Sequence, residues 1–455
     1  MKKTGSPMNL FWFRRDLRLK DNAGLVQALR QGLPVQPLFI FDTEILGLLS
    51  NPNDARLTFI HETLGAIQNE LRTAGSDLWV FHGKPKEIFQ KIFSQNNVHT
   101  VYTNRDYEPR ARLRDQSIQE LCHQQGVGFH SLKDQVIFEE NEILTGAGKP
   151  YTIYTPYKKK WLKELQESNF QAHSAAKSGG RFRQEKRPRR MPGLVEMGFK
   201  KTLLDFASQW RTSSQELMTY ATDRDFPALE ATSKLGLHLR FGTVSVRSLV
   251  RKAHSMIKDS GDVWLSELIW REFFMQILFH FPEVEKKSFR PEYETMAWRK
   301  SSSEFQRWCD GQTGYPLVDA GMRELKATGY MHNRVRMVTA SFLTKHLLMH
   351  WSLGEKYFAR HLLDYELASN NGNWQWVAGT GCDAAPYFRI FNPLAQADRF
   401  DPDREYINKW VPELDTQKYP KPMLEHSVAR DRALRAFSLA LRESKKMSMS
   451  RQKRK

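Results

Sequence analysis

Cysteine is scarce in this sequence, and acidic side chains are few relative to basic ones. The 455 residues include only three cysteines, Cys122, Cys309 and Cys382, which lie far apart in the chain. Their number and spacing exclude a disulfide framework and a cysteine-based zinc site, and are typical of a reducing compartment. No apolar run approaches the roughly 20 residues that a membrane-spanning helix needs. We therefore expect a soluble, cytoplasmic protein without a signal peptide, membrane segment or metal site.

The shortage of acidic residues gives the chain a large positive charge. There are 69 Lys and Arg residues against 51 Asp and Glu residues, which leaves a formal net charge of +18 and an isoelectric point near 9.7. Such a surplus attracts a polyanion, both by steering and by the release of counterions. We expect this partner to be nucleic acid, because the sequence has no basic amphipathic helix with a clear apolar face to anchor it to a membrane.

The first 135 residues have the pattern of an α/β domain. Short continuous apolar runs alternate with helical stretches, and such runs are typical of parallel strands that are covered on both faces. We expect strands at 10–13, 37–41, 78–81, 100–102 and 126–132. The segment after the first strand, 13–16, is not G-x-G-x-x-G, so a dinucleotide is not expected there in the usual way. The fold class of residues 1–135 is a Rossmann-like parallel sheet domain.

The pattern changes twice in the rest of the chain. Residues 136–200 lose the apolar period, and six Lys or Arg residues at 181–190 indicate an interdomain connector. That basic run is either a solvated linker or a direct contact to phosphate. Beyond residue 200 the strand signals stop, so we expect an all-α domain at 201–435 and a basic tail at 436–455, whose end from Lys445 onward is too polar to pack and should be frayed. One buried helical stripe is predicted from Met331, Val335, Val338, Phe342 and Met349.

Charged and aromatic side chains interrupt an apolar helix at residues 267–274. Glu267 and Arg271 are four residues apart and can form an intrahelical ion pair while Trp270 fills the core. Alternatively, Glu267 and Trp270 share one helical face and line a pocket for a flat polar ligand. A second helix brings Arg334 and Arg336 two residues apart, which suits recognition of phosphate or carboxylate.

Several motifs then occur in a fixed order along the chain. Residues 370–376 read Asn-Asn-Gly-Asn-Trp-Gln-Trp, residues 330–334 read Tyr-Met-His-Asn-Arg, and 11–18 read Phe-Trp-Phe-Arg-Arg-Asp-Leu-Arg. Together with the tryptophan helix, they resemble the photolyase/cryptochrome family, closest to the class I cyclobutane pyrimidine dimer photolyases. The resemblance covers most of the chain. It implies FAD held in the helical domain, beneath a cavity that opens to DNA.

The resemblance implies a set of FAD-binding residues. The family holds the FAD phosphates with a Thr-Ser-x-Leu turn at a helix start, which Thr232 and Ser233 begin here, although these two residues could also be a plain helix N-cap. Asn370 matches the position that faces flavin N5, or else caps a turn. Glu366 stands where the family usually has a second Asp. The implied FAD contacts are Tyr220, Thr232, Ser233, Lys234, Leu235, Gly236, Trp264, Arg336, Asp364, Tyr365, Glu366 and Asn370.

The resemblance also implies a substrate pocket and a route for electrons. Glu267 matches the residue that hydrogen-bonds the damaged bases, and flat aromatic walls suit a flipped pyrimidine dimer. The implied reaction is electron transfer from light-excited, reduced FAD, so it needs no metal. The residues expected to take part are Glu267, Asn370, Trp298, Trp351 and Trp374, the last three as a tryptophan chain. The implied substrate and DNA contacts are Arg224, Glu267, Trp270, Asn333, Arg334, Met337, Trp376 and Gln396.

Three functions are compatible with these residues to different degrees. Light-dependent repair of DNA that contains pyrimidine dimers fits Asn370 and His332-Asn333, which follow the pattern of the cyclobutane enzymes. A cryptochrome-type blue-light receptor is the alternative, and the short sequence after Leu414 disfavours it. A flavin- and DNA-binding module without repair would not need the pocket residues. Loop 104–110 lacks the Asn-Glu pair of folate-binding relatives, so a second, antenna chromophore stays unidentified. We expect a monomeric repair lyase.

Overall fold

The computed structural model describes residues 5–174, 181–202, 212–256 and 261–452, and the chain divides into two compact units. Unit 1 comprises Met1–Glu142, Trp161–Trp210 and Lys234–Ile257. Unit 2 comprises Ile143–Lys160, Arg211–Ser233 and Lys258–Lys455. The segment expected to be a connector, 136–200, is therefore shared between the units.

Unit 1 is built on one sheet of five parallel strands. These are β1 (Met8–Phe13), β2 (Val35–Asp42), β3 (Trp79–Gly83), β4 (Val98–Asn104) and β5 (Gly128–Leu132), in the order β3-β2-β1-β4-β5. Phe11 of β1 lies opposite Pro37 of β2 and Tyr102 of β4. Every residue of β1 and β2 is buried, which explains their unbroken apolar runs. The five expected strands and the α/β fold class are confirmed.

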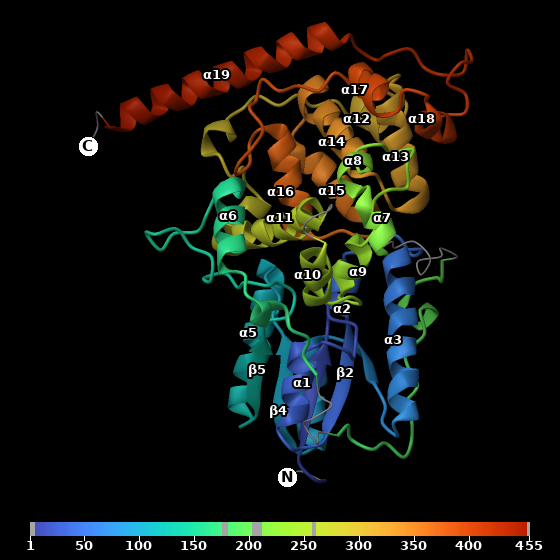
Figure 1. Ribbon diagram of the computed structural model, residues 1–455, viewed down its shortest axis with the longest axis vertical. Coiled ribbons are helices and arrows are strands. Elements are labelled where there is room, and N and C mark those ends of the chain that lie inside the picture. The colour runs from blue at the N-terminus through green and yellow to red at the C-terminus, as the bar shows by residue number, and fades with distance from the viewer. Residues whose placement is uncertain (1–4, 175–180, 203–211, 257–260, 453–455) are drawn as a thin grey trace. The chain divides into compact units, whose positions relative to one another are not determined.

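Helices connect the strands of unit 1 and cover the sheet, and α3 and α5 lie on opposite sides of the strands in Figure 1. Gly24 in α1 allows close approach, because a Cβ there would lie 2.9 Å from the Phe11 ring. Leu10, Trp12 and Phe89 belong to the core below these helices. The helices are α1 (Ala23–Arg30), α2 (Thr43–Leu46), α3 (Ala55–Thr73), α4 (Pro85–Gln95), α5 (Pro109–Gln124), α9 (Gly236–Phe241) and α10 (Val246–Ser255), with short turns η1 (Glu167–Phe170) and η2 (Val195–Met197).

The basic run at 181–190 packs against the sheet of unit 1. Phe182 forms an isolated bridge with Val35, and the Arg189 guanidinium lies 4.0 Å from the centroid of the Trp79 ring. Arg183 approaches the same buried ring at 5.2 Å. A cation over an aromatic face is a stabilising contact. Arg189 is nevertheless exposed, and the two interpretations from the sequence, a solvated linker or a phosphate contact, stay predictions.

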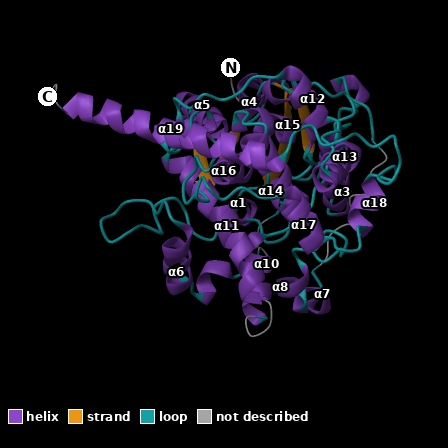
Figure 2. Cartoon of the chain, turned by 90° about the horizontal axis from the view of Figure 1, so that it is seen from above, coloured by secondary structure: helices purple, strands orange, loops and turns teal. Residues whose placement is uncertain are grey.

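Among the residues that the structure describes, the regular secondary structure of unit 2 is helical, apart from an isolated bridge between Leu144 and Pro150. Figure 2 shows mostly helices, drawn in purple. None of the helices described is long and apolar enough to cross a membrane. The helices are α6 (Tyr154–Glu164, shared with unit 1), α7 (Ser214–Met218), α8 (Tyr220–Asp223), α11 (Gly261–His280), η3 (Pro282–Glu285), η4 (Pro291–Tyr293), α12 (Ser302–Cys309), α13 (Pro316–Thr328), α14 (Asn333–Ser341), η5 (Phe342–His346), α15 (Trp351–His361), α16 (Leu367–Ala378), α17 (Pro393–Phe400), α18 (Glu405–Trp410) and α19 (His426–Gln452).

Helix α16 lies at the centre of unit 2 and packs against α11, α14 and α15. Two glycines allow this close packing, because a Cβ on Gly372 would collide with the Phe274 ring and one on Gly354 would collide with the Trp374 ring. The predicted stripe is confirmed, since its five residues are all completely buried: Met331, Val335, Val338, Phe342 and Met349. These contacts hold the helices that carry the candidate site.

Helix α19 occupies most of the segment that was predicted to be a frayed tail. Ala429, Ala433, Phe437 and Ala440 recur at helical spacing and are buried, and Phe437 packs against the rings of Tyr293, Trp298 and Tyr387. The prediction of fraying is wrong as far as Gln452. The segment from Lys445 to Gln452 continues the helix whose buried stripe ends at Ala440. The C-terminal half of α19 projects from the rest of unit 2 (Figures 1 and 2).

Candidate active site

Glu267 and Arg224 form an ion pair at the middle of helix α11. Nη1 of Arg224, which follows helix α8, donates to Oε1 of Glu267, and the guanidinium lies 5.8 Å from the centre of the Tyr220 ring. The two side chains are 40% and 33% exposed, so the pair is within reach of a ligand. Burial raises the pKa of Glu267, while the Arg224 charge opposes that rise. Arg271 of the same helix pairs instead with Glu366, at 3.1 Å.

Trp270 is held in place by a stacked tyrosine. The Tyr154 ring lies 3.5 Å from the Trp270 ring, centroid to centroid, at an interplanar angle of 7°. The Tyr154 hydroxyl donates to the backbone oxygen of Ser266 at 2.9 Å, and Lys158 binds the Ser266 side chain at 2.5 Å. Sequence reasoning missed Tyr154 because it lies in the expected connector. The helical spacing of Tyr154, Tyr157 and Trp161 was the signal that could have revealed it.

The expected DNA contacts on helices α14 and α17 form a second group. Arg334 pairs with Asp225 at 2.8 Å, and its guanidinium lies 4.2 Å from the centre of the Phe400 ring of α17. Asn333 and Met337 meet on one face of α14, with the amide nitrogen 4.0 Å from the sulfur. In α17, the side-chain oxygen of Gln396 is buried and has no hydrogen-bond partner among the described residues. A buried acceptor of this kind is ready to accept a donor from a ligand.

Arg336 and Asp364 form the pair that was expected beside the flavin. Nη2 of Arg336 donates to Oδ2 of Asp364 at 2.9 Å, and Nε donates to the backbone oxygen of Met331 at 2.7 Å. The other carboxylate oxygen, Oδ1, is buried and has no partner in the described part of the chain. Leaving such an acceptor unpaired costs about 1–3 kcal/mol. A flavin supplies N–H and O–H donors, so this orphaned oxygen fits the expected FAD site.

Asn370 is buried and anchored to helix α15. Its side-chain nitrogen donates to Oε1 of Glu355 at 2.9 Å and to the backbone oxygen of the same residue at 3.1 Å. Burial raises the pKa of the Glu355 carboxyl. The contact fixes the amide so that its nitrogen points toward α15. Glu355 is a second residue that the sequence did not single out, because it lies on another helix and outside every motif.

The three tryptophans of the expected electron route lie among other aromatic rings. Trp374 contacts Trp308 with ring centroids 6.2 Å apart. The ring of His350 lies 5.2 Å from Trp351 and 5.4 Å from Trp298, so it contacts both tryptophans. Trp351 and Trp374 are buried and Trp298 is half-buried. Trp308 and His350 were not singled out from the sequence, where they are an isolated tryptophan and histidine.

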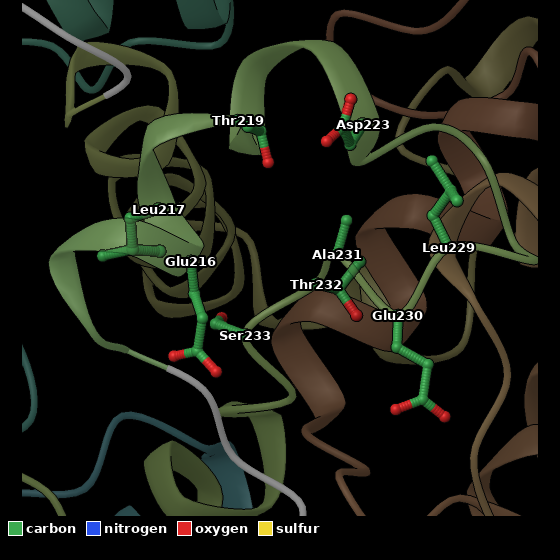
Figure 3. A pocket seen from close by; sticks show the side chains of 9 residues that line it. All are labelled: Glu216, Leu217, Thr219, Asp223, Leu229, Glu230, Ala231, Thr232 and Ser233. Carbon is green, nitrogen blue, oxygen red and sulfur yellow. The ribbon is translucent and has the colours of Figure 1, made fainter.

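A pocket of about 250 Å³ lies beside Thr232 and Ser233 (Figure 3). In Figure 3 these residues face Thr219 and Asp223 across the pocket, while the Glu230 carboxylate points away. The Thr232 hydroxyl is 3.0 Å from the Tyr330 hydroxyl. The full lining is Glu216, Leu217, Thr219, Asp223, Leu229, Glu230, Ala231, Thr232 and Ser233.

Thr232 and Ser233 are not helix N-caps. Helix α9 begins at Gly236 and its N-cap position is Leu235, which makes no side-chain cap hydrogen bond. Lys234, just before it, adopts a left-handed backbone with a φ of 51°. The N-cap interpretation is therefore wrong. The helix start that the resemblance implies does follow, three residues after Ser233.

Of the remaining expected residues, Lys234, Leu235 and Gly236 belong to unit 1, and the others belong to the helical unit. Trp264 of α11 is buried, with 2% exposure, and Tyr220 is buried beneath Arg224. Tyr365 and Trp376 are half-buried and pack against the helical core that contains Trp374. Trp376 therefore combines the aromatic face and the partial exposure expected of a pocket wall.

The structure defines a protein with one parallel α/β unit and one helical unit, and the buried free oxygen of Asp364 fits a flavin. Residues 9–176 match the DNA photolyase family, and residues 264–418 match the FAD binding domain of DNA photolyase. The chain belongs to the DNA photolyase family. The family, fold class and FAD domain expected from the sequence are confirmed.

Proteins similar to this chain match nearly all of it. The deoxyribodipyrimidine photo-lyase of Halobacterium salinarum is 35% identical over 95% of this chain and 99% of its own. A bacterial class III photolyase from Agrobacterium tumefaciens superposes with a TM-score of 0.85 at 33% identity, covering 96% and 98%. An archaeal photolyase from Sulfolobus tokodaii with two FAD molecules has a TM-score of 0.81 at 32% identity, covering 95% and 100%. The similarity thus extends beyond the class I enzymes that the motifs suggested.

Proposed function

We propose that this protein repairs DNA in the light, splitting cyclobutane pyrimidine dimers by electron transfer from reduced FAD. One observation carries the proposal: α11 presents Glu267 and Trp270 one turn apart, beside Arg224, in the helical unit that matches the FAD binding domain. In an extruded nucleotide, the carboxyl group can bind the edge of the base, the flat ring can stack on its face, and the guanidinium can bind the phosphate. The name of the Halobacterium salinarum relative supports the same substrate.

The FAD site that we propose lies in unit 2. Arg336 and Asp364 would contact the flavin ring, and the Oδ1 atom of Asp364 has no partner among the described residues. Asn370 would face the same ring from α16. Thr232 and Ser233 would receive the phosphates. Bound FAD supplies the light-driven electron, which no side chain of the protein can provide.

The protein's part in the reaction is to extrude, orient and shield the damaged bases. The rings of Tyr154, Phe273 and Phe274 hold Trp270 in place, so it would serve as a rigid wall. Trp376 offers a second flat surface, since base–aromatic stacking contributes about 1–3 kcal/mol per base. Arg334 would bind phosphate, and Asn333 and Met337 would border the same opening. A dimer stacks poorly in the duplex, so extruding it costs less free energy than extruding a normal base pair.

The tryptophans would serve as the route by which the flavin is kept reduced. We propose that Trp374 is its inner end and Trp298 its outer end, because Trp374 is buried and Trp298 is half-buried. His350, in contact with both Trp298 and Trp351, would fix the spacing of the outer two rings.

The test is repair of two defined oligonucleotides. The reduced protein is illuminated with blue light on DNA that holds one cyclobutane thymine dimer, and on DNA that holds one (6-4) product, and restored thymines are counted. We expect repair of the first only, and none in the dark. Repair of neither, by a protein that binds flavin and reduces it in light, would contradict the proposal and favour the blue-light receptor.

A further inference from the structure

The C-terminal segment of the chain carries a large part of the protein's positive charge. Residues 426–455 contain ten Lys and Arg residues against two acidic residues, which gives this segment +8 of the net charge of +18. Its described part is helix α19, which begins after residue 418, where the match to the FAD binding domain ends. None of the residues assigned above to FAD, to the pyrimidine dimer or to DNA lies in this helix.

One face of α19 fastens its N-terminal part to unit 2. Ala433, Phe437 and Ala440 are buried on that face, and Leu441 packs against the same cluster. The Lys345 ammonium also lies 3.7 Å from the centroid of the Phe437 ring. Beyond Leu441 the side chains that the structure describes are exposed or half-buried, and the helix extends away from unit 2 (Figures 1 and 2). A polar helix of this kind gains little stability from packing, so a partner would add to it.

Three exposed cations, Arg435, Arg442 and Lys446, form a row on the opposite face of α19. They are seven and four residues apart, so they lie within about 40° of one another around the helix axis and span about 16 Å along it. We call these three residues the cation row. Asp431 of the same helix pairs with Arg430 at 3.5 Å, and none of the three cations pairs with a carboxylate among the described residues. The row is therefore available to an external anion.

The length of the cation row suits the phosphates of duplex DNA. Base pairs are 3.4 Å apart along the axis of the duplex, so about 16 Å of helix spans about five of them. Each cation that neutralises a phosphate also releases a counterion, which favours binding. The helix dipole stabilises cations only within the last turn, so it does not account for Arg435, which lies well before the end of α19 at Gln452.

An anionic membrane surface fits the same charge less well. A helix that lies on a membrane needs a broad apolar face beside its cations. The apolar face of α19 is packed against unit 2 as far as Leu441. Among the described side chains of α19, Val428 and Leu439 are the large apolar ones that are exposed, and they are three turns apart. Nucleic acid is therefore the partner that the cation row favours.

We propose that the cation row of α19 binds the phosphate backbone of duplex DNA, through residues other than those of the proposed pocket. Phosphate contacts carry no sequence information, so the row holds damaged and undamaged duplexes alike. It adds a second contact to any DNA that the protein meets, and this contact prolongs its stay on undamaged duplex while damage is sought. The inference goes beyond the proposed function, because it requires neither FAD nor light.

The experiment measures binding of an undamaged duplex by fluorescence anisotropy, in the dark, at several salt concentrations. The triple variant Arg435→Gln, Arg442→Gln and Lys446→Gln removes the cation row, and glutamine preserves the helix because its helix propensity is high. We expect the slope of log affinity against log salt to become shallower by about 2.7, since each lost phosphate contact removes about 0.9. A dimer-containing duplex should show the same change, so the ratio of the two affinities should stay constant.

The matched control removes three exposed lysines from unit 1. The triple variant Lys84→Gln, Lys86→Gln and Lys91→Gln, at the start of α4 and along it, lowers the net charge by the same amount on another surface. We expect its salt slope to equal that of the unchanged protein. Circular dichroism and flavin absorbance verify that both variants are folded and contain FAD.

Each outcome decides one question. A salt slope that is unchanged in the α19 variant overturns the inference, and so does an equal change in the α4 variant, because total charge would then be responsible. If vesicles of anionic phospholipid bind the unchanged protein, and the α19 variant loses this binding but keeps its salt slope for DNA, the partner is a membrane and the inference is wrong. A protein that shows the expected slopes but repairs neither oligonucleotide would contradict the proposed function and support this inference.

Discussion

Unit 1 and unit 2 both contain arginine–carboxylate clusters, but the two clusters differ in exposure and in the number of their hydrogen bonds. In unit 1, Arg247 pairs with Asp134 at 2.7 Å and with Asp21 at 2.9 Å. Arg247 is 4% exposed and Asp134 1%, and Asp134 also receives Arg18 and the backbone N–H of Ala23. In unit 2, the two arginines that are expected to contact DNA each have one carboxylate partner, 36–40% exposed.

The direction of the pKa shifts follows this difference. The charges of Arg18 and Arg247 overcome burial and hold the pKa of Asp134 below its usual value. At Glu267 burial dominates over Arg224, and the pKa is raised. A carboxylate that is stabilised as an anion by several partners serves the fold. A carboxylate with one removable partner and a raised pKa is suited to exchange with a ligand.

The largest effect is expected from removing the central cation of the unit 1 cluster. Arg247→Met leaves Asp134 and Asp21 buried with fewer partners, and breaking a buried pair in this way costs about 3–5 kcal/mol. Urea unfolding monitored by circular dichroism measures the loss. The matched variant Arg224→Met should lose less than about 1 kcal/mol, because its partner is partly solvated. Equal losses would remove the distinction between the two clusters.

Acid sensitivity sharpens the same comparison. Arg15 and neighbouring arginines lower the pKa of buried Asp106 to about 2 from 3.8. The folded pKa is below the unfolded one, so the stabilisation is complete above pH 4 and is lost as the pH falls toward 2; the shift corresponds to about 2 kcal/mol.

Asp106→Asn should therefore be less stable than the unchanged protein at pH 7 and should show a shallower loss of unfolding free energy between pH 4 and 2. Glu267→Gln should have the opposite effect. Because the pKa of Glu267 is raised in the folded protein, its ionised form lowers the free energy of unfolding at pH values above that pKa. The variant should therefore be as stable at pH 7 as the unchanged protein, or more stable. If the Asp106→Asn variant still shows a steep loss of unfolding free energy between pH 4 and 2, other carboxylates are responsible for that loss.

A smaller effect is expected at the proposed pocket wall. Trp376→Ala removes one stacking surface, and roughly tenfold weaker binding to dimer-containing DNA should result, near the low end of the 1–3 kcal/mol that one stacked base contributes. Undamaged DNA should bind almost as before. Fluorescence anisotropy with both DNAs measures the ratio, which cancels any general loss of stability. Equal weakening for both would show that Trp376 does not contact the lesion.

The smallest change concerns a phosphate contact. Arg334→Met should lower affinity for damaged and undamaged DNA alike and reduce the slope of log affinity against log salt by about one. Anisotropy titrations at several salt concentrations provide the slope. A change confined to dimer DNA would instead place Arg334 at the bases.

Patterns that are local in the sequence predicted the fold well. Runs such as Leu10 to Phe13 are buried strands, and the stripe from Met331 to Met349 is completely buried, because periodicity directly reports which face meets the core. The end of the tail was mispredicted because residues 445–452 are polar, and their helix continues from a segment that Phe437 and Leu441 anchor. The fold class could be predicted from these local patterns of apolar residues alone.

The candidate site was less accessible to sequence reasoning, since its contacts join distant segments. The resemblance selected Glu267 and Trp270, yet nothing near them in sequence identifies Arg224 as the ion-pair partner or Tyr154 as the stacking partner. Asp225 and Glu355 were missed for the same reason. Partner choice depends on tertiary packing, which the spacing of residues along one helix does not encode.

The position of Arg247 in the chain has a consequence for biosynthesis. Asp21 and Asp134 emerge from the ribosome long before the arginine that neutralises them, which arrives with helix α10. Until then, nascent unit 1 has its five strands but carries these two acidic side chains with Arg18 as a counter-ion to Asp134. The ion cluster is therefore completed only after the five strands and the first segments of unit 2 have been made.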